Sequence, residues 1–239
     1  MLLTVEETKS RWIAFNSERV EAGLDAMTPG LNLALLIASN ALLGQKQWSG
    51  EDYMEHPLHV GFNGTSSTTK QIVGVLHDVV EDSDWTLQDL EDIGYDKKII
   101  DGVDAVTKRD GEKYFDFIMR CSMSGPEGID TKIRDLGHNS MRHRSANINL
   151  EDYPRQKADV YNISYWYLVA VKKGEIEPGT PIETFVENHP EFSKNLDYIN
   201  QTLFPRFYSG YEDVDVNSTA SAEYTGHADD QHPGGMTQG

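Results

Sequence analysis

The stretch Leu76-His77-Asp78-Val79-Val80-Glu81-Asp82 most constrains the fold, because one imidazole and three carboxylates directly follow an apolar run. That run, residues 72–76, predicts a buried helix. Burying such polar groups is costly unless they are paired with one another or bound to a metal ion. We therefore expect this helix to carry a divalent cation, with further ligands supplied by other parts of the chain.

Apolar residues recur at helical spacing along most of the chain, and no sustained alternation demands a β-strand. The predicted helices cover residues 1–24, 31–44, 70–82, 86–93, 96–107, 112–123, 129–143, 154–173, 182–188 and 191–207. Turns are expected at residues 28–30, 48–53, 125–128 and 178–181. This pattern predicts an all-α fold with one helical domain over residues 1–208.

The predicted helix over residues 70–82 would gather its polar groups on adjoining faces. His77 and Glu81 are four residues apart and therefore share a face. Asp78 and Asp82 have the same spacing and share the next face. The simpler alternative is a histidine that is salt-bridged or hydrogen-bonded on an ordinary helix.

Two other segments carry residues of the same chemical kind. His56 precedes Pro57, so it is expected to be extended or at the start of a helix. Asp135 lies in the predicted helix over residues 129–143. Two imidazoles and two carboxylates suit manganese or iron better than a closed zinc–thiolate site, with zinc as an alternative, and leave room for water and a phosphate oxygen. The four expected ligands are His56, His77, Asp78 and Asp135.

Composition narrows the class of partner and the compartment. A formal net charge of −18 disfavours binding to duplex nucleic acid or to anionic membrane surfaces. The single cysteine excludes an intramolecular disulfide framework, and neither a signal peptide nor a membrane-spanning run is present in the sequence, so a cytoplasmic protein is expected. Residues 209–239 are rich in acids, Gly, Ser and Thr and are expected to be a disordered tail.

Several separated motifs follow one another in a fixed order along the chain: Gly44-Gln45, Ser49-Gly50-Glu51, Tyr53, His56-Pro57, Leu76 to Asp82, Val106-Thr107-Lys108, Lys132-Ile133-Arg134-Asp135, His138-Asn139 and Met141-Arg142. In these motifs the chain resembles the HD-domain phosphohydrolases, most of all the RelA/SpoT-type alarmone hydrolase domain and its stand-alone small relatives. The resemblance covers about residues 31–170. It implies an all-helical HD-domain bundle, a manganese ion, and hydrolysis of the 3′-pyrophosphate of (p)ppGpp with release of pyrophosphate.

The resemblance also assigns roles to individual residues. The positions that match the family's metal ligands are His56, His77, Asp78 and Asp135. Glu81 and Asp82 match the acid pair that handles the attacking water, and Asn139 matches an asparagine that contacts substrate. His138 is expected to support the metal-binding helix, and His59 to be structural. The other expected substrate-binding residues are Lys46, Gln47, Ser49, Lys108, Lys132 and Arg142, with a solvated helix face as the alternative for the basic ones.

The sequence departs from the family where the nucleotide base would be recognised. Gln47 stands where the family has an arginine that stacks on guanine, and Lys46 lies beside it out of register. Leu136 and Gly137 replace the usual Arg-Leu after the metal-binding aspartate. The missing stacking contact is worth roughly 1–2 kcal/mol, which would redirect base selectivity rather than abolish hydrolysis.

Two other functions stay open from the sequence. One is an HD-type hydrolase of another nucleotide, such as a dNTP triphosphohydrolase or a nucleotidase, which Gln47 favours. The other is a non-catalytic HD module that binds a nucleotide, which four intact ligands and an intact acid pair disfavour. In each case the expected partner is a small-molecule nucleotide. The helices outside the best-matching region are expected to cap the bundle or to form a contact between identical chains.

Overall fold

The computed structural model describes residues 3–47, 50–145 and 155–210, with side chains described for residues 3–47, 50–140 and 156–210. The described residues form helices joined by turns, with no strand beyond an isolated antiparallel bridge between Lys46 and Asp52. This confirms the all-α prediction. The helices are α1 (Val5–Glu21), α2 (Leu31–Ala41), α3 (Glu55–Phe62), α4 (Thr68–Leu76), α5 (Leu87–Asp92), α6 (Lys97–Val106), α7 (Tyr114–Ser122), α8 (Pro126–Ser145), α9 (Arg155–Lys173), α10 (Ile182–Asn188), α11 (Leu196–Tyr198) and α12 (Phe204–Phe207).

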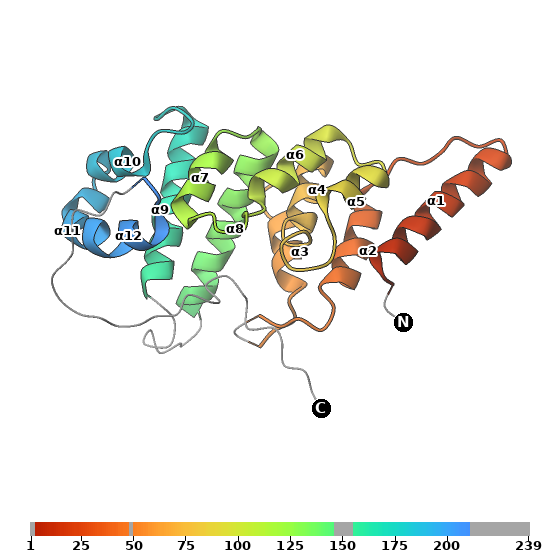
Figure 1. Ribbon diagram of the computed structural model, residues 1–239, viewed down its shortest axis with the longest axis horizontal. Helices are drawn as coiled ribbons and strands as arrows, with labels where there is room; N and C mark the ends of the chain where they lie inside the picture. Colours follow the sequence, from red (N-terminus) through yellow and green to blue (C-terminus); the bar gives the residue numbers. More distant parts are fainter. Residues whose placement is uncertain (1–2, 48–49, 146–154, 211–239) are drawn as a thin grey trace.

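Helix α8 lies near the middle of an elongated molecule, with α1 and α2 toward one end and α10 to α12 at the other (Figure 1). It packs against α3, α4, α6, α7 and α9. One apolar cluster is built mainly by α2, α4, α5 and α6, and the other mainly by α7, α9 and the helices that follow. Residues that must meet from distant parts of the sequence therefore do so along α8.

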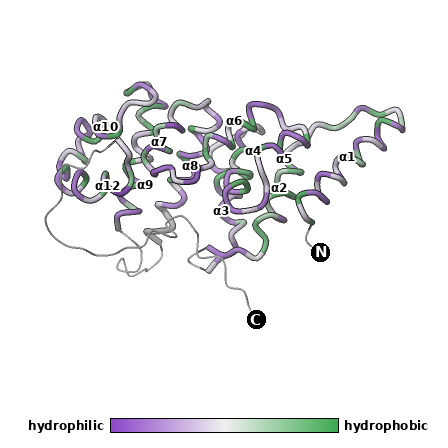
Figure 2. The backbone as a smooth tube through the Cα atoms, viewed as in Figure 1, coloured by the Kyte–Doolittle hydropathy of each residue, from purple (hydrophilic) through white to green (hydrophobic). Residues whose placement is uncertain are grey.

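Helix α1 is held at the edge of the molecule by a few polar contacts. A capping box between Thr4 and Glu7 starts the helix. Lys9 Nζ then lies 2.7 Å from Asp89 Oδ1, and Trp12 Nε1 donates a hydrogen bond of 2.9 Å to the carbonyl of Ile93. Figure 2 shows the difference between this mixed helix and the largely hydrophobic α2 beside it. Among the described helices, none combines the length and apolarity needed to cross a bilayer.

Two glycines let α3 and α4 cross with their backbones in contact. A Cβ atom at Gly74 would lie 2.7 Å from Gly61 Cα and 2.8 Å from the carbonyl oxygen of Val60. No other residue type fits there without moving one helix. The close crossing places His56, at the start of α3, next to His77, which directly follows α4.

The prediction of a helix over residues 70–82 is wrong at its end, because α4 stops at Leu76 and residues 77–84 form turns and bends. His77 Nδ1 lies 2.8 Å from the Gly74 carbonyl, so a side chain occupies an acceptor that the next backbone N–H of a helix would use. Two separate backbone bonds follow, from the Val79 N–H to the Leu76 carbonyl at 3.0 Å and from the Asp82 N–H to the Asp78 carbonyl at 2.8 Å. The polar groups of this stretch therefore lie on a turn rather than on two faces of one helix.

Other boundaries also differ from the sequence expectations. The segment around His56 is a helix, so of the two alternatives the helix start is confirmed. The predicted turn over residues 125–128 is wrong, because α8 already begins at Pro126, whose fixed φ suits a first helical turn. Residues 211–239 of the expected tail lie outside the described residues.

Candidate metal centre

Helix α3, the end of α4 and helix α8 bring two imidazoles and a carboxylate together in the interior. His56 Nε2 lies 3.1 Å from His77 Nε2 and 3.1 Å from Asp135 Oδ1. The three ligand-type atoms of His56, His77 and Asp135 all lie within 4.8 Å of one another, and all three residues are buried. Lone pairs that converge in this way need a shared proton or cation. The group fits a metal ion, because nitrogen and oxygen donors already face a common point.

Asp78 lies at the edge of this group. Its Oδ1 is 3.1 Å from His77 Nε2, and its Oδ2 is 3.5 Å from His56 Nε2. All four residues that the sequence predicts as metal ligands therefore lie close together in the structure. Their role as ligands stays a prediction.

Burial and charge together set the protonation of the group. Burial opposes the charged form of His77, but the carboxylates of Asp78 and Asp135 outweigh it and raise its pKa to about 9. Burial lowers the pKa of His56. Burial also works against ionised Asp135, yet Lys132 and His56 hold its pKa well below the usual value. The carboxylates are therefore ionised near neutral pH, ready to accept a cation.

The raised pKa of His77 predicts how the metal-free protein responds to pH. A group whose pKa is higher in the folded state stabilises the fold below its unfolded pKa, and that contribution is lost as the pH rises. As the pH rises from 6.5 to about 9, His77 loses its proton. The free energy of unfolding of the metal-free protein is expected to fall by about 3 kcal/mol over this range. Urea unfolding at several pH values measures this loss. The metal-loaded protein should lose less, because a metal ligand is a neutral imidazole; equal losses in both forms would contradict the assignment.

Outer contacts orient the four residues. His138 Nδ1 lies 2.8 Å from His56 Nδ1, which leaves His56 Nε2 directed at the centre. Asn139 Nδ2 donates to Asp135 Oδ1 at 2.7 Å, and Lys132 Nζ lies 2.8 Å from Asp135 Oδ2. Such contacts fix the tautomer of a histidine and the direction of a carboxylate.

The acid pair and Tyr53 lie beside the centre. The hydroxyl of Tyr53 is 2.9 Å from Asp78 Oδ2 and 3.0 Å from Asp82 Oδ2, so one phenol bridges the two carboxylates. Glu81 Oε2 accepts a hydrogen bond of 3.1 Å from the Lys108 N–H. Glu81 is exposed as a residue, but the surrounding protein partly desolvates its carboxyl group. That desolvation, together with the charges of Asp78 and Asp82, raises its pKa to about 7.

Removing the bridging hydroxyl is expected to disturb the acid pair without removing a ligand. The Tyr53→Phe variant loses the donor to Asp78 and Asp82, and comparable outer partners are worth about 10–100-fold in metal affinity or activity. Metal content and turnover should be measured on the same preparation. The matched control is Tyr95→Phe, whose hydroxyl donates to the Gly30 carbonyl at 3.2 Å and which should behave like the wild type. Equal effects of the two changes would contradict the role of Tyr53.

The expected substrate-binding residues lie in different surroundings. Lys46 is exposed, 3.7 Å from Asp52 Oδ2, whereas Gln47 is 5% exposed and its Nε2 donates to the Asp52 carbonyl at 3.0 Å. Lys132 is buried, 4.6 Å from the centre of the Phe117 ring. Lys108 and Asn139 lie next to Glu81 and Asp135, as described above. Ser49 and the side chain of Arg142 lie outside the described residues.

Two residues of this region had no site role in the sequence expectations. Tyr53 belongs to a recognised motif, but its contacts are with residues 25 and 29 positions away, so spacing gave no signal for them. His59, expected to be structural, stacks on His138 with ring centroids 3.9 Å apart. Together with His56 and His77 these rings form a row of four imidazoles that runs outward from the centre.

Known proteins match part of this chain. No family model matches it. A stretch of 89 residues is 35% identical to the bifunctional (p)ppGpp synthase/hydrolase SpoT of Escherichia coli (strain K12), and equally to the guanosine-3′,5′-bis(diphosphate) 3′-pyrophosphohydrolases of Escherichia coli O157:H7 and Shigella flexneri. Each match covers 36% of this chain and 12% of the relative's length. The local match supports a relationship of this chain to the RelA/SpoT-type hydrolases.

Proposed function

We propose that this chain is a metal-dependent phosphohydrolase with an HD-type helical bundle, which removes the 3′-pyrophosphate of (p)ppGpp and releases pyrophosphate. One observation carries the proposal: the buried group of His56, His77 and Asp135, with Asp78 at its edge. The local similarity to (p)ppGpp 3′-pyrophosphohydrolases supports the substrate class.

The donor set supports a divalent cation of intermediate hardness, and we propose manganese, with iron or zinc as alternatives. His56, His77, Asp78 and Asp135 would hold it. A cation bound there would lower the pKa of its bound water and would polarise a phosphate oxygen of the substrate.

The acid pair would handle the proton of the attacking water. Glu81 has a pKa of about 7, which suits a group that must accept a proton near neutral pH. The hydrogen bond from the Lys108 N–H holds one oxygen of Glu81 and leaves the other available to water. Asp82 would orient the water, because Tyr53 ties its carboxylate to that of Asp78.

We propose that the substrate's phosphates and ribose contact Lys46, Ser49, Lys108, Asn139 and Arg142. Lys132 would act through its charge, since it is buried against Asp135. Gln47 lies buried with its amide on the Asp52 carbonyl, so it offers no stacking plane of the kind a guanidinium provides. This placement favours one alternative substrate, a nucleotide with another base, for the same metal and acid residues.

A nucleotide panel with manganese separates these possibilities. Turnover of ppGpp with release of pyrophosphate supports the proposal, and release of triphosphate from a dNTP supports the alternative. Mass spectrometry of the products identifies which bond is cut. No turnover of any nucleotide, with metal bound, would contradict both and favour a non-catalytic module.

A further inference from the structure

A cavity of about 460 Å³ lies where the end of α3 meets α8 and α9. Its size is that of small-molecule sites in proteins. It does not include Glu81, Asp82 or Tyr53, and it touches the metal centre only through the back of His138. It is therefore a separate space, on the side of His138 and not on the side of the acid pair Glu81 and Asp82.

The cavity is cationic although the chain is strongly acidic. Among the described residues, its lining contains Arg134 and the imidazoles of His59 and His138 but no Asp or Glu. The whole chain has 39 acidic residues against 21 lysines and arginines. An acid-free lining around a guanidinium is the surrounding that an anionic ligand requires.

Arg134 has only neutral partners among the described residues. Its Nε donates to the Val60 carbonyl at 2.6 Å, and its Nη2 donates to the Lys70 carbonyl and to Thr131 Oγ1, both at 3.2 Å. Asp130, the acid whose charge acts on it, is bound instead by two lysines, Lys70 and Lys172. Among the described residues this half-buried guanidinium thus forms no direct ion pair with a carboxylate, and its Nη1 takes no part in these bonds.

Flat rings form another part of the wall. Tyr165 and Trp166 both line the cavity, with ring centroids 5.4 Å apart, and Trp166 is 38% exposed. A large exposed indole beside a cationic group offers a face for a planar ring.

Gly137 keeps the cavity open from within α8. A Cβ atom there would have Tyr165 Cε2, at 3.7 Å, as its nearest neighbour, so neither packing nor backbone conformation requires a glycine. Glycine inside a helix costs about 0.5–1 kcal/mol relative to alanine. A larger side chain at this position would project toward Tyr165 and fill the space.

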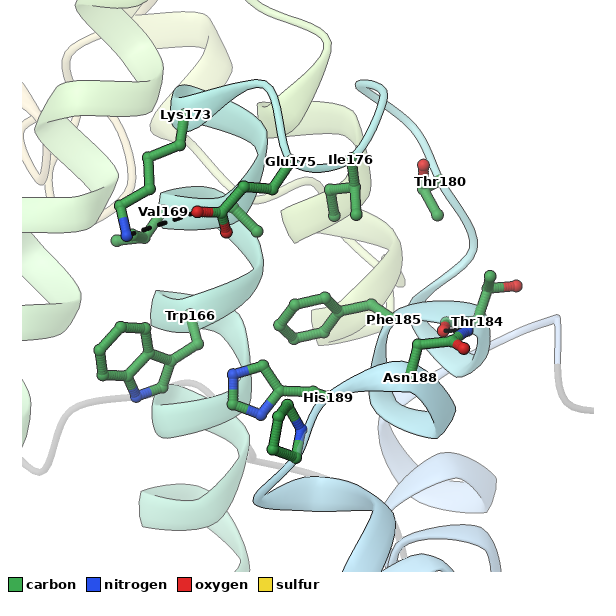
Figure 3. A pocket seen from close by; sticks show the side chains of 12 residues that line it. Trp166, Val169, Lys173, Glu175, Ile176, Thr180, Thr184, Phe185, Asn188 and His189 are labelled. Atoms are coloured by element: carbon green, nitrogen blue, oxygen red, sulfur yellow. Dashed lines mark hydrogen bonds and ion pairs between the residues drawn. The ribbon is translucent and has the colours of Figure 1, made fainter.

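A second cavity, of about 560 Å³ between α9 and α10, also has Trp166 in its wall but differs in its charge (Figure 3). Its cation, Lys173, faces Glu175 at 3.6 Å, so the charge on its rim is balanced. Asn188 on the same rim donates to the Thr184 carbonyl at 2.7 Å. It serves below as the matched comparison.

We propose that the cavity between α3, α8 and α9 binds a small oxyanion that carries a planar ring, of the class of the nucleoside monophosphates. The oxyanion lies on Arg134 and the imidazole edge, and the ring lies against Tyr165 and Trp166. Neither the metal nor hydrolysis enters this proposal, so it stands or falls separately from the function proposed above.

Calorimetric titration of the full chain with adenosine 5′-monophosphate tests the site, with adenosine and inorganic phosphate as the two halves of the probe. The monophosphate is expected to bind more tightly than either half. Gly137→Leu should abolish binding, and Arg134→Gln should weaken it about tenfold or more. Lys173→Gln, on the rim of the other cavity, should leave binding unchanged.

Metal content and melting temperature of each variant show whether the fold and the centre are intact. If Gly137→Leu fails to fold, the Arg134→Gln result alone tests the proposal, because this change removes the positive charge without filling the cavity. No binding up to about 5 mM monophosphate, where even a millimolar site is detected, would overturn the proposal. So would binding that both Gly137→Leu and Arg134→Gln leave unchanged, since the probe would then lie elsewhere.

Discussion

The Asp135→Asn variant is expected to lose metal and turnover together. One oxygen of Asp135 faces both imidazoles, because Oδ1 lies 3.1 Å from His56 Nε2 and 3.8 Å from His77 Nε2. Loss of an outer partner of a ligand already weakens metal binding about 10–100-fold, so loss of a ligand should weaken it by at least about 100-fold. Elemental analysis after gel filtration measures the metal, and pyrophosphate release measures turnover.

The same change should also destabilise the metal-free protein. Lys132 Nζ lies 2.8 Å from Asp135 Oδ2, and the two side chains are only 10% and 6% exposed. Removing one partner of such a buried pair costs about 3–5 kcal/mol, because the other charge stays buried without compensation. The matched control is Asp130→Asn on the same helix, whose carboxylate binds Lys70 and Lys172 away from the centre. If Asp135→Asn retains full metal, or if Asp130→Asn loses it, the assignment of the centre is wrong.

The Glu81→Gln variant is expected to keep its metal and lose turnover. A general base contributes about 10²–10⁴-fold to rate, and glutamine cannot accept the proton of the attacking water. Glu81 is not part of the buried group, so the metal content should equal that of the wild type. The control is Asp84→Asn, the same chemical change at an exposed position three residues later.

The pH profile gives Glu81 a signature that a structural role would not produce. Its pKa is raised to about 7, and only the ionised carboxylate accepts a proton. Activity of the wild type should therefore fall as the pH drops through about 7 and level off above it. In Glu81→Gln this acidic limb should disappear along with most of the rate. Normal activity in Glu81→Gln would remove the residue from the mechanism.

The sequence was sufficient for the fold class and for the grouping of the centre. Helical spacing predicts the helices, and the separated motifs predict that His56, His77, Asp78 and Asp135 meet, as they do. The end of α4 was not predictable from spacing, because it depends on a bond between a side chain, His77, and the Gly74 carbonyl.

The other features that the sequence could not predict depend on contacts between residues far apart in the chain. The bridge from Tyr53 to the carboxylates exists only once α3 and the turn after α4 are packed. The space beside Gly137 is visible only when α9 lies against α8. Roles in substrate binding stay predictions, because each depends on a ligand as well as on the chain.

The crossing of α3 and α4 at Gly61 and Gly74 determines how far apart the imidazoles of His56 and His77 lie. The separation of His56 and His77 is set by direct contact between the backbones of α3 and α4. A Cβ atom at Gly74 would lie only 2.7 Å from Gly61 Cα, so the two helices have no room for a side chain between them. A single methyl group at Gly74 would push α3 and α4 apart and His56 and His77 with them, so the spacing of the two imidazoles depends on a position that carries no side chain.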